Sequence, residues 1–285
     1  MDKTLEALGK LPPFSPVLTR VLVTLSGDEV SFGELGELIE KDPVLSGNIL
    51  NLANSAFYAR REATNSVRHA SVRLGVKKLQ NAILGLSISR LWNQMHMPGY
   101  WSMARFNLHA AAAALLSDLL AQRLPVAYPE GAFVAGLLHD LGQLLMVRSL
   151  PDEYDQVLRL FEEGPGDLQQ CEEAIFGFTH AEASAAALGQ WNLPEPTRLA
   201  VRFHHNPGLD PASSNRREIP LSRIIAAANG YVNSIGISVL LKNGPADPPD
   251  VSIQALGGLG LDAGRLEKLL NEFSAENAAM AQFFR

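Results

Sequence analysis

The sequence predicts an all-α fold, and three observations support that prediction. Apolar residues recur with helical spacing along the chain, and signals for helix starts precede several of these stretches. No convincing period-two alternation, which would indicate a strand, is found. We therefore expect a bundle of many helices.

Helix starts are predicted from capping residues. In Asp42-Pro43 the aspartate can accept hydrogen bonds from the free N–H groups of a helix, and proline suits the first helical position. Further helix boundaries are predicted at Ser31 and Glu34 and at Thr179 and Glu182, which have capping-box spacing, at Pro151 and at Gly75.

Apolar faces predict which helices pack. One face consists of Leu79, Ala82, Ile83, Leu86 and Ile88, and a second of Leu108, Ala111, Ala112, Leu115, Leu116 and Leu119. The small side chains of Ala110–Ala114 should let helices approach closely. The segment Gly244–Pro249 is expected to be a loop, followed by two short helices around Ala263–Phe273 and Ala275–Phe284.

The helix-breaking segment Met97-Pro98-Gly99 suggests two lobes. We expect an N-terminal helical lobe over residues 1–98, with about five helices, and a second lobe over residues 99–285. The first lobe holds His69 and His96, and the second holds the other five of the seven histidines.

Composition and net charge favour some classes of protein over others. Of the 285 residues, 47% are hydrophobic and 19% charged, which is typical of a soluble globular protein. A net charge of -6 argues against a partner that is a polyanion, either nucleic acid or an anionic membrane. Basic residues do cluster, and we interpret them as a solvated helical face: Arg60, Arg61, Arg68, Arg73, Lys77 and Lys78.

The cellular compartment is predicted from the cysteine count, the N-terminal residues and the length of the apolar stretches. Cys171 is the single cysteine, which excludes an intrachain disulfide framework and a Cys-rich zinc site. Met1–Lys10 does not have the pattern of a signal peptide, and the apolar stretch Ala110–Leu120 is too short to span a bilayer. We expect a cytoplasmic protein with a buried thiol and no membrane association.

Histidines and an aspartate form the main chemical signal, since each lies on or beside a different predicted helix. They are His109, the pair His139-Asp140, His180 and the pair His204-His205. Imidazole nitrogen and carboxylate oxygen are ligands for zinc, iron and manganese, and helices that point such groups inward can build a metal centre. Spacing alone leaves open the alternative of hydrogen-bonded histidines, the interpretation we apply to His69 and His96.

Two segments of the chain resemble the HDOD family. The first comprises Leu11-Pro12-Pro13, Pro16, Asp42-Pro43-Val44-Leu45, Leu50, the run Ala53-Asn54-Ser55-Ala56-Phe57-Tyr58, Ser66, Ala70 and Leu74-Gly75. The second comprises Ala135–Gly142, Phe176–Glu182, Trp191-Asn192-Leu193-Pro194 and His204-His205. The resemblance covers roughly residues 11–231.

The resemblance implies an all-α, HD-domain-like bundle related to metal-dependent phosphohydrolases. It implies that His109, His139, Asp140, His180, His204 and His205 bind one or two ions of iron, manganese or zinc. The sequence departs from the superfamily at Asn229, an amide and so a weak ligand where a carboxylate usually stands, and at Gln143, where active relatives often carry lysine.

The N-terminal motif has two interpretations. Asn54 and Ser55 could bind a ligand or the second lobe, but side-chain bonds to backbone groups at a helix end are their more common role. We expect Phe57 and Tyr58 to be packing residues.

Three functions follow from these observations. The favoured one is a bacterial signal-transduction module that acts by binding a signalling protein or a ligand such as a nucleotide, without catalysis. The alternative is a metal-dependent phosphohydrolase acting on a nucleotide or cyclic dinucleotide, in which a histidine or Asp140 shuttles protons. A nucleic-acid regulator using the basic cluster ranks last. The apolar Phe273, Phe283 and Phe284 would suit a homodimer interface as well as the chain's own core.

Overall fold

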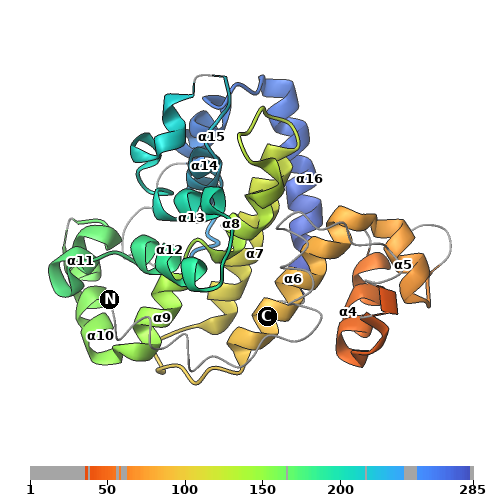
Figure 1. Ribbon diagram of the computed structural model, residues 1–285, viewed down its shortest axis with the longest axis horizontal. Coiled ribbons are helices and arrows are strands. Elements are labelled where there is room, and N and C mark those ends of the chain that lie inside the picture. The colour runs from red at the N-terminus through yellow and green to blue at the C-terminus, as the bar shows by residue number, and fades with distance from the viewer. Residues whose placement is uncertain are drawn as a thin grey trace. The chain divides into compact units, whose positions relative to one another are not determined.

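The structure is a computed structural model, and it describes residues 36–37, 39–55, 58, 63–164, 166–215, 217–240 and 249–282. Within these ranges the regular elements are helices, and the one β contact is an isolated parallel bridge between Val126 and Ile219. The predicted all-α fold is confirmed (Figure 1).

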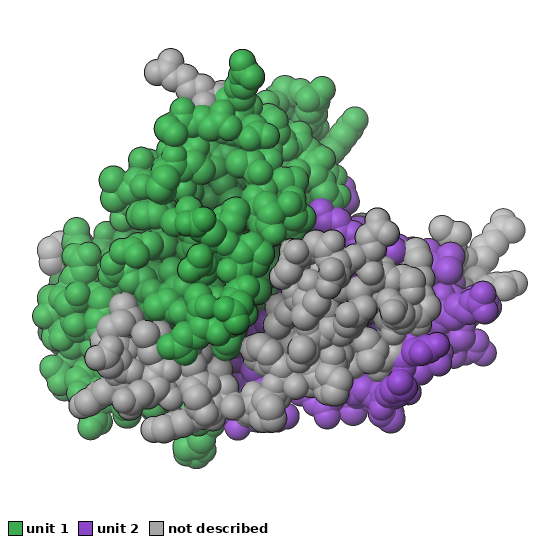
Figure 2. Space-filling model, viewed as in Figure 1, with its two compact units in different colours: residues 1–11, 96–270 green, residues 12–95, 271–285 purple. Residues whose placement is uncertain are grey.

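The chain forms two compact units (Figure 2). Unit 1 contains His96–Leu270, and unit 2 combines the described residues up to Met95 with residues 271–282. Helices of unit 1 are α7 (Met103–Ala121), α8 (Ala132–Leu138), α9 (Leu141–Ser149), α10 (Pro151–Glu163), α11 (Leu168–Phe176), α12 (His180–Gln190), α13 (Glu195–Arg202), α14 (Leu221–Ser234), α15 (Pro249–Gly257) and the start of α16 (Ala263–Ala281). Helices of unit 2 are α4 (Pro43–Ala53), α5 (Val67–Leu74), α6 (Val76–Asn93) and the rest of α16.

Unit 2 follows the predicted helix boundaries. The Asp42 side chain accepts hydrogen bonds from the N–H groups of Val44 and Leu45 at 3.1 Å and so caps α4. Gly75 separates α5 from α6 with φ of 81°, a conformation that favours glycine. The predicted apolar face of α6 is buried, and α4, α5 and α6 pack on one another.

Asn54 has the structural role predicted for it. Its side chain exchanges two hydrogen bonds of 2.8 Å with the backbone of Thr64, and Arg73 donates to its oxygen at 3.1 Å. Tyr58 donates its hydroxyl to Glu276, which also accepts from Lys78 at 2.8 Å. These bonds connect residues far apart in the sequence within unit 2.

Unit 1 is organised around α7, which is buried along almost its whole length. It packs against α8 and α14, as Figure 1 shows. The close approach predicted for Ala110–Ala114 is confirmed at Gly136, because a Cβ there would lie 2.7 Å from the Ala114 Cα. Only glycine fits this crossing of α7 and α8, which brings the end of α8 beside α7.

A second close contact joins α9 to α12. A Cβ on Gly142 would lie 2.0 Å from the His180 carbonyl oxygen. Ser184 connects the same helices, since its hydroxyl accepts from the Gly142 N–H at 2.7 Å and donates to the His139 carbonyl at 2.8 Å. These contacts place the start of α12 against the turn that carries His139 and Asp140.

The C-terminal helices differ from the prediction. One continuous helix, α16, replaces the two short helices expected around Ala263–Phe273 and Ala275–Phe284. Residues 265–281 contain no glycine or proline that would end the helix, and Ser274 alone does not end one. Helix α15 was not predicted and begins at Pro249, the last residue of the expected loop.

Several sequence predictions fall outside the described residues. They concern Leu11, Pro12, Pro13, Pro16, the capping box at Ser31 and Glu34, Phe57, Arg60, Arg61, the loop over residues 244–248, Phe283 and Phe284. The lobe boundary at residue 98 stays a prediction. Cys171 is buried, as expected, and forms no disulfide. Among the described helices, none has both the length and the apolar character needed to cross a bilayer.

Candidate metal centre

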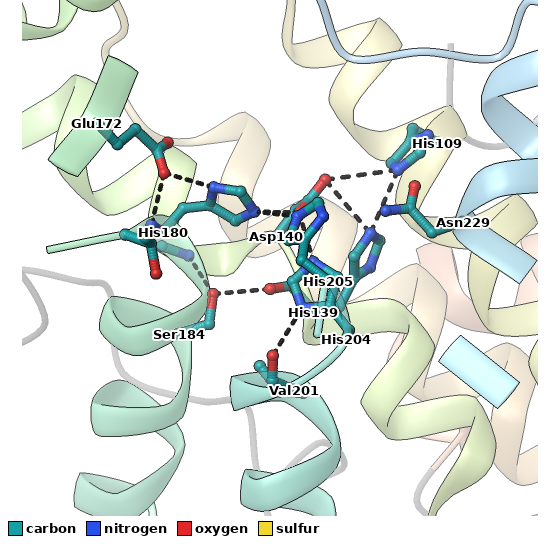
Figure 3. Close-up of polar contacts among 12 residues, drawn as sticks. His109, His139, Asp140, Glu172, His180, Ser184, Val201, His204, His205 and Asn229 are labelled. Atoms are coloured by element: carbon teal, nitrogen blue, oxygen red, sulfur yellow. Dashed lines mark hydrogen bonds and ion pairs between the residues drawn. The ribbon is translucent and has the colours of Figure 1, made fainter. Parts of the chain in front are cut away.

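Six candidate ligand residues come together in unit 1 (Figure 3). They form two groups that share Asp140, one with His109 and His139 and one with His180, His204 and His205. In each group, one ligand atom per residue lies within 4.8 Å of the others. His109 comes from α7, His139 and Asp140 from the α8–α9 turn, His180 from the start of α12, and the last two follow α13.

Hydrogen bonds fix the orientation of four imidazole rings. The Nδ1 atoms of His109, His139 and His204 face the carbonyl oxygens of Ile237, Gly136 and Val201 at 2.7, 2.8 and 2.6 Å. His180 Nδ1 faces a Glu172 carboxylate oxygen at 2.7 Å. A carbonyl or carboxylate oxygen only accepts, so each Nδ1 carries a hydrogen, and a ring presents an Nε2 lone pair when it is in its neutral form.

The four Nε2 atoms converge on the Asp140 carboxylate. His109 and His139 lie 3.4 and 3.3 Å from Oδ2, and His180 and His204 lie 3.3 and 3.7 Å from Oδ1. Two Nε2 pairs also face one another, His109 with His139 at 3.3 Å and His180 with His205 at 2.9 Å. Facing lone pairs repel each other unless a proton or a cation lies between them, so this arrangement suits a cation.

Asp140 is the central charge of the cluster. Burial alone would raise the pKa of its carboxyl, but the charge of His139 and hydrogen bonds from His109, His139 and His180 outweigh burial and hold the pKa well below its usual range. Asp140 is 4% exposed and is therefore a buried, ionised carboxylate surrounded by imidazoles. A buried charge requires a compensating partner, which here is a protonated histidine or a metal ion.

Two histidines of the second group differ in their charge. Burial would lower the pKa of His180, yet attraction to Glu172 and hydrogen bonds to Asp140 and Glu172 raise that pKa to about 10. Burial and the charges of His205 and His139 lower the pKa of His204. Without metal, one proton therefore resides on His180, and His204 is neutral.

Solvent reaches the cluster only at one of its six side chains. His109, His139, Asp140, His180 and His204 are each at most 4% exposed. His205 is the exposed member. A bound ion would therefore be enclosed by protein except near His205.

The two residues that depart from the superfamily pattern are both buried. Asn229, on α14, accepts a hydrogen bond from Asn233 at 2.7 Å and lies beside His109 in Figure 3. Gln143, on α9, is 4% exposed, and its side-chain oxygen has no hydrogen-bond partner. Neither supplies the charge that the corresponding carboxylate or lysine would bring.

Sequence reasoning missed Glu172 and Ser184. Glu172 is fully buried, and its Oε2 accepts from both the ring Nδ1 and the backbone N–H of His180. A signal was present, because Leu168, Cys171, Glu172 and Ile175 share helical spacing and place a carboxylate on an apolar face. His69 and His96 are exposed and lie outside the cluster.

The family follows from a comparison with known domains. Residues 11–207 match the family model described as the HDOD domain. The chain belongs to the HDOD family. A curated relative, an uncharacterised protein of Treponema pallidum (strain Nichols), is 25% identical over 212 residues, which are 70% of this chain. The chain spans 39% of the length of that relative.

Solved structures share the HDOD fold. An HDOD domain protein of unknown function from Geobacter sulfurreducens is 24% identical, with a TM-score of 0.77 over 99% of this chain and 97% of that one. A protein of Shewanella amazonensis SB2B, provisionally named a phosphohydrolase, is 23% identical, with a TM-score of 0.75 over 99% and 98%. A Marinobacter aquaeolei VT8 protein, provisionally named a signal transduction protein, is 24% identical, with a TM-score of 0.71 over 96% and 60%.

Proposed function

We propose that this HDOD chain is a regulatory module that binds a signalling protein or a ligand, and that its histidine–aspartate cluster holds a divalent metal ion without catalysing turnover. The observation that supports metal binding most strongly is the convergence of four Nε2 atoms on Asp140, with each Nδ1 held by an outer acceptor. Outer hydrogen bonds of this kind accompany metal-binding histidines in proteins.

Iron, manganese and zinc all accept this set of ligands. Asp140, His180, His204 and His205 would hold one ion, and His109 and His139 would complete a second position with the shared Asp140. When bound, a divalent ion supplies positive charge near two buried carboxylates, Asp140 and Glu172.

Burial and missing charges favour regulation over catalysis. A phosphate substrate would need to reach the cluster, yet only His205 is exposed. Asn229 and Gln143 would provide neither a further negative ligand nor a cation for the phosphate. A buried ion would instead fix the helices that carry its ligands, so occupancy would alter the stability of unit 1 and the surface it offers to a partner.

Hydrolysis assays of metal-loaded protein test this proposal. Protein loaded with manganese, iron or zinc is incubated with bis(p-nitrophenyl) phosphate and with cyclic dinucleotides. We expect bound metal in the wild type and no hydrolysis above that of His139→Ala. Hydrolysis by the wild type that His139→Ala abolishes would instead establish the phosphohydrolase alternative.

A further inference from the structure

Glu172 is a buried carboxylate outside the candidate ligand set. It lies on α11, is 0% exposed, and its Oε2 accepts from the His180 ring at 2.7 Å and from the His180 backbone N–H at 2.8 Å. The two bonds hold both the ring and the first residue of α12. One carboxylate oxygen thus fixes the position of His180 at the start of α12 and the direction in which its Nε2 points (Figure 3).

The other oriented histidines have weaker acceptors. His109, His139 and His204 donate to neutral backbone carbonyls, whereas His180 donates to a carboxylate. A hydrogen bond to a charged acceptor is stronger, and it makes the opposite ring nitrogen a better electron donor. His180 is also the only one of the four whose Nδ1 acceptor is a side chain and can be changed by substitution.

We propose that Glu172 is a positioning residue that holds His180 Nε2 toward Asp140 and so makes the group Asp140, His180, His204 and His205 the tighter of the two metal positions. The inference rests on the proposed metal site. The other group has only three candidate ligands, His109, His139 and the shared Asp140. The side chain beside it, Asn229, is a neutral amide.

Glu172→Gln tests the inference with Co²⁺ as the probe. Glutamine keeps the shape and an acceptor oxygen but removes the charge. Affinity is measured by competition with a chromophoric chelator, and the visible spectrum of Co²⁺ reports its coordination. We expect Co²⁺ affinity to fall roughly 10- to 100-fold and the spectrum to change, as is usual when the outer partner of a metal-binding histidine is removed.

Glu276→Gln is the matched control. Glu276 is a glutamate that is 4% exposed and accepts from Lys78 and Tyr58 in unit 2. The same substitution there removes a buried charge without touching the cluster, so Co²⁺ affinity should change less than about threefold. Urea denaturation of both metal-free variants separates a loss of folding stability from a loss of affinity.

A double-substitution cycle isolates the route through His180. If Glu172 acts through that ring, Glu172→Gln adds no further loss of affinity to His180→Ala. Should Glu172→Gln not fold, Glu172→Asp serves instead, because it keeps the charge but withdraws the carboxylate by one methylene, and a smaller loss is expected.

The outcomes distinguish the inference from the proposed function. Wild-type protein that binds Co²⁺ as tightly as Glu172→Gln, with the same spectrum, would overturn the role of Glu172 and leave the metal site standing. An equal loss in Glu276→Gln would overturn it as well. Wild-type protein that binds no Co²⁺ would overturn the proposed metal site, and the inference with it.

Discussion

The protonation of single residues determines how the charges of the cluster are balanced when no metal is bound. Each oriented ring directs Nε2 at Asp140, and the proton on His180 compensates the buried carboxylates. A metal ion would replace this proton, since ligation requires neutral imidazole. Metal binding and proton release are therefore coupled at a single residue.

That coupling predicts a pH dependence of the metal-free protein. The pKa of His180 is raised from 6.5 to about 10, so its protonation favours the folded state fully below pH 6.5, and this contribution is lost as pH rises through 10. Urea denaturation of metal-free protein should show the free energy of unfolding falling by more than about 1 kcal/mol across this window. Metal-loaded protein and His180→Ala should lack the decrease, and a decrease of equal size in His180→Ala would assign it to other groups.

Asn229→Asp tests the missing carboxylate. Aspartate keeps an acceptor for Asn233 and adds a negative charge beside His109, which should favour an ion in the group with His139. We expect metal affinity to rise about tenfold or the metal content to increase toward two ions per chain. Calorimetric titration with manganese measures both quantities, and unchanged binding would show that Asn229 lies outside the coordination sphere.

Helix contacts bring the ligands together, and glycine enables two of these contacts. The sequence indicated the helices through capping residues and apolar spacing, as at Asp42 and Thr179. It did not indicate that Gly142 meets the His180 carbonyl, because that contact joins residues from separate helices and has no local pattern. The spacing around Glu172 does place a carboxylate on an apolar helix face, but its partner His180 could not be read from it, because packing of α11 against the start of α12 sets that contact.

Gly142→Ala should disrupt the cluster through the backbone. The added methyl would lie 2.0 Å from the His180 oxygen, so α9 and α12 must separate. We expect a loss of about 1–3 kcal/mol in the free energy of unfolding, together with weaker metal binding. Gly230→Ala is the control, because a Cβ there meets no atom within 4 Å and alanine favours the helix. Comparable losses in both variants would contradict a specific contact at Gly142.

At the scale of the whole molecule, the end of α16 completes unit 2. Phe273 is 2% exposed and Glu276 is bonded to Tyr58 and Lys78, so this part of α16 packs in the chain's own core. Phe273 was considered either for a homodimer interface or for the chain's own core, and its burial within the chain supports the role in the core. The continuity of α16 was not predicted, because the apolar pattern alone does not say where a helix ends.

Phe273→Ala should therefore destabilise the monomer itself. Removal of a buried phenyl ring is expected to lower the free energy of unfolding by about 3–5 kcal/mol. The loss should not depend on protein concentration in urea denaturation. A loss that shrinks as the protein is diluted would indicate that Phe273 contributes to a dimer instead.

The most direct test of a metal centre is elemental analysis of protein purified without chelators. Wild type, His139→Ala and His96→Ala are compared, the last because His96 is exposed and outside the cluster. We predict near-stoichiometric iron, manganese or zinc in wild type and His96→Ala and its loss in His139→Ala. Metal absent from all three folded proteins, or retained in His139→Ala, would contradict the proposed centre.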